Sequence, residues 1–269
     1  MRVREYGTSG PLVIVLHGGP AALGEAAPIA RGLSDSFRSL EPWQRGSGDE
    51  PLSVARHVAD LHELVEERSA GVSPALVGES WGAMLALACA AEHPDSAGAI
   101  VLVGCGSFDS QARARMHATL EQRTDEDLRK RLAAMREAIE DPGERIMKFA
   151  ELTEKLYRFD PISHDREDTG RFDERAYSES WADMVRLQEE GIYPAAFSAI
   201  RSPVLMLHGT YDPHPGRMIQ ASLQPHLPQL EYQEWERCGH SPWLEKAVRD
   251  EFFEMLRDWL RRHTTRNLG

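Results

Sequence analysis

Short apolar runs alternate along the chain with longer stretches in which apolar residues recur every three or four positions. The clearest runs are LVIVL at 12–16, AIVLVG at 99–104 and PVLMLHG at 203–209, and each ends in or beside a glycine turn. Continuous apolar runs of this length are typical of strands that are buried on both faces of a sheet. The pattern therefore predicts a sheet with several fully buried strands.

Between these runs the apolar period becomes that of an amphipathic helix. Val54, Val58, Leu61 and Val65 are separated by four, three and four residues, which places them on one helix face. Further helices are expected at 22–33, 81–93, 216–224 and 244–261, and further strands at 36–42, 74–78 and 230–236. Strands and helices in this order form parallel βαβ units, so the predicted fold class is α/β, with a doubly wound, mostly parallel sheet.

The stretch from about 107 to 197 interrupts this alternation. It contains no convincing buried strand, and segments such as LEQRTDEDLRKRLAAMREAIE are charged and have helical spacing. Two or more helical hairpins inserted after a central strand explain this pattern, and such an insertion usually covers an active site. We therefore expect a core formed by residues 1–106 and 198–269, and a helical cap insertion formed by residues 107–197.

Composition restricts the classes of function. The 269 residues include 43 acidic and 31 basic side chains, with a net charge of −12 at pH 7, so no nucleic-acid partner is expected. No apolar run reaches the ~18–20 residues of a membrane helix, and the polar N-terminus lacks a signal-peptide core. Cys89, Cys105 and Cys238 are too few and too scattered for a disulfide framework or a metal site. These features favour a cytoplasmic protein, with no membrane partner, that acts on a small molecule.

A G-x-S-x-G motif, Gly78-Glu79-Ser80-Trp81-Gly82, lies between a predicted strand and a predicted helix. A sharp strand-to-helix turn strains the serine backbone and leaves no room for side chains two positions away on either side, which explains the glycines. The turn would present the Ser80 hydroxyl above the sheet, beside a helix N-terminus that favours negative charge. A plain tight turn is the alternative, but the strand–turn–helix context favours Ser80 as a nucleophile.

A serine nucleophile needs a base, and the base needs an acid to orient it. The expected order along this type of fold is serine, acid, histidine. Asp212 follows the PVLMLHG strand and His240 follows the last strand, so both are expected at the carboxyl ends of strands, where open α/β sheets bind ligands. Among the other histidines, His164 and His214 are weaker candidates, and His62 and His93 are expected at the surface.

An oxyanion hole completes the predicted site. One donor is expected to be the backbone N–H of Trp81, directly after the nucleophile, and the other that of Gly19 in the turn His17-Gly18-Gly19-Pro20. A plain loop at the end of the strand is the alternative interpretation of this turn. Two glycines before a proline, directly after the first buried strand, favour the oxyanion role.

Three segments together resemble the α/β-hydrolase superfamily, and within it the proline iminopeptidase branch: HGGP at 17–20, WQRGSGDEP at 43–51 and GESWGAMLAL at 78–87. That branch carries an HGGPG loop, a DQRGxGxS segment and a GGSWG turn, and it cleaves N-terminal proline from short peptides. The resemblance implies Ser80 as nucleophile, Asp212 as acid and His240 as base, with no cofactor and no metal. The sequence departs from the branch at Ala21, Trp43, Asp49 and Glu79.

Several neighbouring residues have two interpretations. Glu79 either holds a substrate ammonium or braces a neighbouring loop, and bracing is favoured. Gln44 and Arg45 fit a structural loop better than substrate contact. The aromatic residues that either line an acyl pocket or pack in the core are Trp81, Trp181 and Trp243.

The leading hypothesis is a serine hydrolase that forms an acyl-enzyme on Ser80 and hydrolyses a small ester or amide. An aminopeptidase similar to proline iminopeptidase is the alternative, and it would need cap carboxylates to bind the substrate ammonium; the candidates are Glu179, Asp183, Glu189 and Glu190. A cofactor-free haloperoxidase or a C–C bond hydrolase would keep the same three catalytic residues. A ligand receptor on a hydrolase scaffold is the non-enzymatic alternative.

Overall fold

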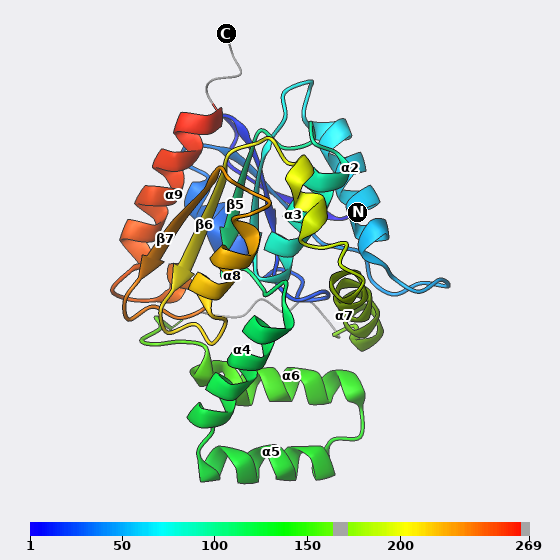
Figure 1. The fold of residues 1–269 in the computed structure, drawn as a ribbon, viewed down its shortest axis with the longest axis vertical. Helices are drawn as coiled ribbons and strands as arrows, with labels where there is room; N and C mark the ends of the chain where they lie inside the picture. The colour runs from blue at the N-terminus through cyan, green and yellow to red at the C-terminus, as the bar shows by residue number, and fades with distance from the viewer. Residues whose placement is uncertain (164–171, 265–269) are drawn as a thin grey trace.

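A seven-stranded sheet runs through the middle of the molecule in the computed structural model, which describes residues 1–163 and 172–264 (Figure 1). The strands lie in the order β1-β3-β2-β4-β5-β6-β7. β1 pairs antiparallel with β3, and every other neighbouring pair is parallel. The predicted mostly parallel sheet is confirmed. The bounds of the strands are β1 Val3–Tyr6, β2 Leu12–Leu16, β3 Arg38–Pro42, β4 Ala75–Glu79, β5 Ala99–Val103, β6 Val204–Gly209 and β7 Leu230–Trp235.

Helices cover both faces of the sheet. They are α1 (Ala27–Leu33) and α9 (Arg249–Thr264) on one face, and α2 (Val54–Arg68), α3 (Trp81–Glu92) and α8 (Gly216–Leu223) on the other. Successive residues of a strand point to opposite faces, so Val13 and Val15 pack with the first group, and Ile14 and Leu16 with the second. All four are fully or almost fully buried, which explains why this strand reads as a continuous apolar run.

Two elements differ from the sequence-based expectation. β1 was not expected, because the short edge strand VREY has two adjacent charged residues at its centre and is only partly buried. The helix expected at 244–261 begins only at Arg249. Glu245 is extended and forms an isolated bridge with Pro161, so the helix does not continue through it.

The segment between β5 and β6 is helical throughout its described part, apart from loops and that bridge. It contains α4 (Ser110–Arg123), α5 (Glu126–Ala138), α6 (Pro142–Thr153), α7 (Glu174–Glu189) and two short 3₁₀ helices, η1 (Glu154–Leu156) and η2 (Ala195–Ala199). Each of the four α-helices begins after an aspartate whose carboxylate accepts a backbone N–H of the first turn; these residues are Asp109, Asp125, Asp141 and Asp173. The predicted helical insertion is confirmed, while its bounds of 107–197 stay a prediction.

The inserted helices lie beyond the carboxyl ends of the central strands. Figure 1 shows α4, α5 and α6 below the ends of β5 and β6, and a small apolar cluster of Leu128, Met135, Leu152 and Leu156 holds this group together. None of the described helices has an apolar stretch long enough to cross a membrane. All three cysteines are free and buried.

Candidate active site

Ser80 lies on the turn between β4 and α3, in a backbone conformation that L-residues rarely adopt, with φ 51° and ψ −113°. The flanking glycines are required by close backbone approach. A Cβ atom at Gly78 would lie 2.3 Å from the carbonyl oxygen of Gly82, and one at Gly82 would lie 2.4 Å from that of Leu16. The strained turn predicted from the G-x-S-x-G motif is therefore present.

The structure brings Asp212 and His240 together. His240 Nδ1 donates to Asp212 Oδ2 at 2.7 Å, and the carboxylate side chain is completely buried. Asp212 lies in the loop after β6, and the backbone N–H of Tyr211 donates to Cys238 O, which ties this loop to the one that carries His240. The predicted acid and base are thus paired by the loops that follow neighbouring strands.

Ser80 and His240 both lie beside the end of β5. The Ser80 N–H donates to Val103 O at 2.8 Å, and a Cβ atom at the next residue, Gly104, would lie 3.1 Å from His240 Nδ1. Within the described part of the chain, the Ser80 hydroxyl forms no hydrogen bond with His240. Catalytic hydrogen bonds are often long or poorly aligned in active sites without substrate.

Asp212 is bonded to more than one histidine. His214 Nδ1 donates to Asp212 Oδ1 at 2.9 Å, and its ring stacks on that of His240 with 4.8 Å between centroids. His208 Nε2 lies 3.2 Å from Asp212 Oδ2 and 2.9 Å from the carbonyl oxygen of His214. Sequence reasoning ranked His214 below His240 and did not consider His208. The spacing of four residues between His208 and Asp212 was the only available signal.

These contacts shift the pKa values of the pair. Burial alone would raise the pKa of Asp212, but the three imidazoles outweigh it and hold that pKa well below its usual range. Burial would lower the pKa of His240, but the Asp212 carboxylate outweighs it and raises that pKa. Asp212 is therefore ionised at neutral pH, and it stabilises a protonated His240.

The glycine turn lies directly beside Ser80. A Cβ atom at Gly18 would lie 3.3 Å from the Cβ atom of Ser80. The next residue, Gly19, has a φ of 42° and accepts a hydrogen bond from the Ala22 N–H, which closes a tight turn. Trp81 is the first residue of α3, where backbone N–H groups have no acceptor within the helix. Both predicted oxyanion donors therefore belong to segments that border Ser80.

Gln44 connects these two segments. Its backbone N–H donates to His17 Nε2, its side-chain amide donates to His17 O, and its Oε1 accepts from Trp81 Nε1 at 2.7 Å. His17 Nδ1 donates to Gly18 O at 2.9 Å, so the ring is neutral with its proton on Nδ1. Arg45 forms two hydrogen bonds with Asp60. The bracing interpretation of Gln44 and Arg45 is confirmed.

Glu79 is buried beside Ser80. A Cβ atom at Gly18 would lie 3.4 Å from its Oε1, and its Oε2 has no hydrogen-bond partner. Burial, together with the charge of Glu25, raises the pKa of Glu79 to about 8, although His240 and Arg158 act in the opposite direction. Glu79 is thus mostly protonated at pH 7, and it braces the glycine turn with only one of its two oxygens.

The three tryptophans that either line a pocket or pack in the core do not all lie on the same side of the sheet. Trp81 and Trp181 pack edge to face at 5.5 Å. Trp243 packs on Phe252 of α9, on the face of the sheet opposite to Trp81, so it does not line a pocket beside Ser80.

The carboxylates of α7 that were candidates for binding a substrate ammonium have partners within the protein. Glu179 accepts from Leu52 N–H, Asp183 accepts from Val54 N–H and Glu190 pairs with Arg186. For Glu189 the structure shows no role, and His164 lies outside the described residues.

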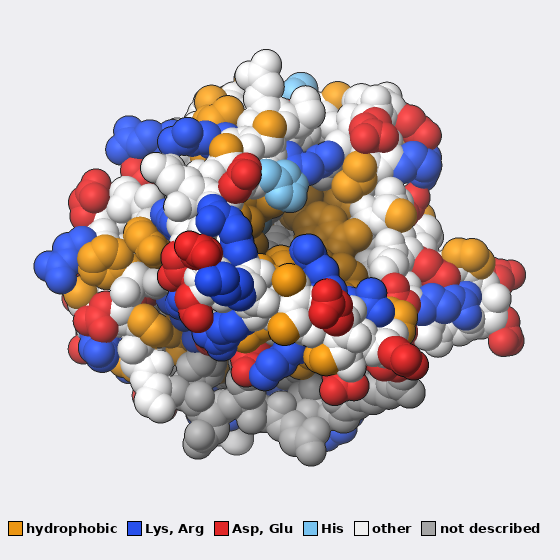
Figure 2. Space-filling model, turned by 90° about the horizontal axis from the view of Figure 1, so that it is seen from below, with side chains coloured by type: hydrophobic (Ala, Val, Ile, Leu, Met, Phe, Trp, Pro, Cys, Tyr) orange, Lys and Arg blue, Asp and Glu red, His pale blue; other side chains and the backbone are white. Residues whose placement is uncertain are grey.

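The end of the molecule nearest the inserted helices carries a hollow. Figure 2 shows this face, with hydrophobic side chains on the floor of the hollow and a histidine and basic side chains at its rim. Tyr157, just after η1, packs edge to face on His240 at 5.9 Å and accepts the His240 backbone N–H with its carbonyl oxygen. The inserted segment therefore contacts the candidate base directly.

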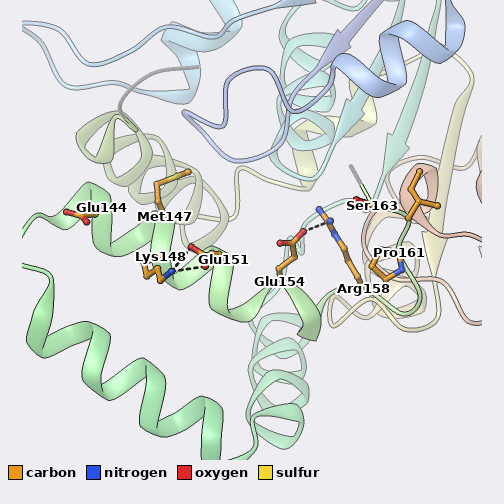
Figure 3. Close-up of a pocket in the computed structure, with 9 residues that line it drawn as sticks. Glu144, Met147, Lys148, Glu151, Glu154, Arg158, Pro161 and Ser163 are labelled. Carbon is orange, nitrogen blue, oxygen red and sulfur yellow. Dashed lines mark hydrogen bonds and ion pairs between the residues drawn. The ribbon is translucent and has the colours of Figure 1, made fainter. Parts of the chain in front are cut away.

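A separate cavity of about 720 Å³ lies along α6 and the segment that follows it (Figure 3). Its described lining contains none of the predicted site residues: Glu144, Met147, Lys148, Glu151, Glu154, Arg158, Pro161, Ile162 and Ser163. Arg158 is paired with Glu154 in this lining, and its charge opposes the rise in the pKa of His240 that Asp212 causes. The cavity thus reaches the neighbourhood of the candidate base without including it.

Glu245 supports the loop that carries His240, although the sequence analysis did not identify it. One carboxylate oxygen accepts the backbone N–H groups of Gly239 and Phe159, and the other accepts that of Asp160, at 2.8–2.9 Å. The side chain thereby fastens the His240 loop to the inserted segment. Because Glu245 falls inside the helix predicted at 244–261, the sequence did not indicate this role.

The model of the alpha/beta hydrolase family matches residues 13–254 of this chain. A proline iminopeptidase from Lactobacillus crispatus (strain ST1) is 28% identical over 277 residues, covering 94% of this chain and 90% of that protein. Among solved structures, VinJ has a TM-score of 0.69 at 19% identity and covers 97% of this chain and 94% of its own. A thermophilic esterase from Thermogutta terrifontis has a TM-score of 0.62 at 19% identity, with coverages of 98% and 93%. Because the family model spans most of the residues described above, including the Ser80 turn and the loops of Asp212 and His240, the chain belongs to the alpha/beta hydrolase family.

Proposed function

We propose that this protein is a serine hydrolase that cleaves a small ester or amide, with Ser80 as nucleophile, His240 as general base and Asp212 as the orienting acid. The observation that carries the proposal is the 2.7 Å hydrogen bond between His240 Nδ1 and the buried Asp212 carboxylate, at the strand end that also bonds Ser80. The bond fixes the tautomer in which His240 Nε2 has a free lone pair for the Ser80 proton.

The reaction proceeds in two steps through an acyl-enzyme. His240 Nε2 takes the Ser80 proton as the serine oxygen attacks the carbonyl carbon, and it then passes that proton to the leaving alcohol or amine. Water repeats the sequence on the acyl-enzyme, with His240 again as base, and releases the acid. The raised pKa of His240 favours the protonated imidazole that forms in each step.

The developing oxyanion is stabilised by the backbone N–H groups of Gly19 and Trp81. These donors lie on two segments held together by Gln44, which contacts both His17 and Trp81. A donor fixed before the reaction loses little energy to reorganisation, and removal of one such donor typically costs about 3–4 kcal/mol of transition-state stabilisation. Residues 107–197 act in this proposal as a cap, with Tyr157 packed on His240.

Esters are favoured over prolyl peptides as substrates. An aminopeptidase must pair the substrate ammonium with a carboxylate, because an unpaired buried charge is costly. Glu179 and Asp183 are already occupied by backbone N–H groups near the start of α2, and Glu79, with a pKa raised to about 8, is mostly neutral at pH 7. The similarity to a proline iminopeptidase nevertheless makes proline nitroanilide the informative competing substrate.

The substrate preference is tested by kcat/KM on one preparation for short-chain nitrophenyl esters and for proline nitroanilide. We expect the esters to be turned over faster. A preference of tenfold or more for the prolyl substrate would overturn this expectation and support the aminopeptidase alternative, with Glu79 as the ammonium partner.

The catalytic assignment is tested with a fluorophosphonate probe and a chromogenic ester. We expect one probe molecule per chain, attached to Ser80, and loss of both labelling and turnover in Ser80→Ala. Ser222→Ala, which changes a half-buried serine on α8, serves as the matched control and keeps both. Labelling elsewhere, or full activity of Ser80→Ala, would refute the assignment. A folded protein with no burst of released alcohol would favour a ligand receptor.

A further inference from the structure

We propose that Asp212, His214 and His240 together form a binding site for a divalent transition-metal ion of the zinc type, and that the bound ion inhibits the enzyme. Each residue offers one ligand atom, and these atoms all lie within 4.8 Å of one another. Binding is independent of the assigned reaction, whereas the inhibition rests on the proposed function. The ion acts here as an inhibitor and not as a cofactor.

The geometry brings the donors of both rings to one carboxylate. His240 Nδ1 lies 2.7 Å from Asp212 Oδ2, and His214 Nδ1 lies 2.9 Å from Asp212 Oδ1. Zinc bonds to nitrogen and oxygen are ~2.0–2.2 Å long, so two ligand atoms of a tetrahedral ion are roughly 3.4 Å apart. Both ring nitrogens must therefore move away from the carboxylate oxygens by roughly 0.5–0.7 Å, and water completes the coordination.

The surroundings suit a metal ligand set. The carboxylate is fully buried, while the side chains of His214 and His240 are 15% and 14% exposed, which leaves both rings accessible from solvent. His208 lies behind the carboxylate, with Nε2 3.2 Å from Asp212 Oδ2. A donor in this position orients a ligating carboxylate.

The ligand types decide which ions bind. Two imidazoles and one carboxylate suit Zn²⁺, Cu²⁺ and Ni²⁺, whereas Mg²⁺ and Ca²⁺ prefer all-oxygen sites. Thiols do not compete, because Cys89, Cys105 and Cys238 are buried. Burial also raises the pKa of each of the three thiols, and only the thiolate is a good ligand.

Inhibition follows from the tautomer of His240. The ion takes the Nδ1 lone pair of each neutral ring, and the proton of that nitrogen moves to Nε2, so no proton is gained or lost overall. His240 Nε2 then carries a proton and no longer accepts the one from Ser80. The ion also replaces the hydrogen bond between His240 and Asp212, so the base loses both its lone pair and its orientation.

The test is titration of the metal-free full chain with zinc chloride by isothermal calorimetry, with magnesium chloride as the control ion. We expect one zinc ion per chain, no magnesium binding, and zinc inhibition of ester turnover that EDTA reverses. His214→Gln is expected to weaken zinc binding by at least roughly 100-fold. The matched control is His117→Gln, which changes an exposed histidine on α4 and leaves zinc affinity and ester turnover unchanged.

The outcomes separate the two proposals. Zinc affinity that is unaltered in His214→Gln, or absence of binding up to millimolar zinc, overturns the site. If His214→Gln fails to fold, as judged by thermal melting, His240→Gln replaces it and is expected to weaken binding equally. Zinc binding to a protein that carries no fluorophosphonate label on Ser80 supports the site and refutes the serine mechanism.

Discussion

At the scale of single residues, one buried carboxylate organises the candidate site. Asp212 accepts hydrogen bonds from His240 and His214 through different oxygens, so both rings hold their protons on Nδ1. His240 differs from His214 because it also packs against Gly104, at the strand end that bonds Ser80. Position relative to Ser80, rather than contact with Asp212, therefore distinguishes His240 as the candidate base.

Asp212→Asn is expected to lower kcat by roughly 10⁴-fold, because an amide stabilises the wrong His240 tautomer. The measurement is kcat on a nitrophenyl ester together with the melting temperature, which shows whether the variant is folded. Asp258→Asn, an exposed position on α9, is the control and keeps the wild-type rate. A folded Asp212→Asn variant with a nearly normal rate would mean that the acid is another residue.

The wild-type protein is expected to lose activity at alkaline pH, and Glu79→Gln is expected to prevent that loss. The carboxyl of Glu79, whose pKa is raised to about 8, is neutral below that pH and ionises above it. The groups that face it are Gly18, Glu25, Arg158 and His240. Ionised Glu79 repels the oxyanion formed on the neighbouring serine, so kcat of the wild type falls by roughly tenfold between pH 7 and pH 9.5, equivalent to about 1.4 kcal/mol.

The pH profile of kcat, recorded for both proteins in buffers of equal ionic strength, checks this prediction. Glutamine keeps the size of the side chain but does not ionise, so its profile stays level across the same interval. If kcat of both proteins fell equally at alkaline pH, a group other than Glu79 would be responsible.

At the scale of elements, the His240 loop and the inserted helices are joined through Glu245. Its carboxylate accepts backbone N–H groups from Gly239 on one side and from Phe159 and Asp160 on the other. The His240 N–H donates to Tyr157 O in the same region. His240 is therefore positioned jointly by the loop after β7 and by the inserted segment.

Glu245→Gln is expected to destabilise the fold by about 1–3 kcal/mol, because the amide nitrogen replaces an acceptor and leaves at least one buried N–H group without a partner. The free energy of unfolding in urea measures this loss. A fall in kcat is expected alongside it, since the His240 loop is less firmly held. Glu254→Gln, an exposed position on α9, changes neither quantity. Unaltered stability of Glu245→Gln would show that water replaces the lost acceptor.

At the scale of the whole molecule, buried neutral histidines link the fold to pH. His17 is fully buried beneath the glycine turn, and His57 is buried between α2 and α7, where its Nε2 lies 2.8 Å from Ser180 Oγ. Desolvation lowers the pKa of each to about 4. A protonated His17 would also leave the Gln44 N–H without its acceptor. Both rings therefore stay neutral in the folded state well below pH 6.5.

The protein is expected to lose stability as the pH falls from about 6.5 to 4. In that interval the unfolded histidines, with a pKa near 6.5, bind protons that the folded ones do not, so acidification favours unfolding. Each of the two residues accounts for about 2 kcal/mol at pH 5. Urea unfolding at pH 7 and at pH 5 measures the change in the free energy of unfolding. In His57→Gln this change is expected to be smaller by the part that His57 contributes. If His117→Gln reduced the pH dependence equally, buried histidines would not be its source.

The sequence by itself determined the alternation of strands and helices and the strained serine turn. Burial on both sides of the sheet demands continuous apolar runs, as in β2, and the Ser80 turn demands Gly78 and Gly82 because a Cβ atom at either would overlap backbone atoms. These requirements are local, so they are visible in a short window of residues. The pairing of Asp212 with His240 was predictable from their places after strands, since parallel strands end at one edge.

Only the tertiary structure decided which side chains meet across long distances in the chain. β1 forms because β3 provides a neighbour, and α9 starts late because Glu245 bonds residues 159 and 160. His208 and His214 join Asp212 through the path of one loop, and Glu179 and Asp183 are occupied by the start of α2. Each of these contacts depends on where two separate segments lie in space, and hydrophobic periodicity carries no information about that.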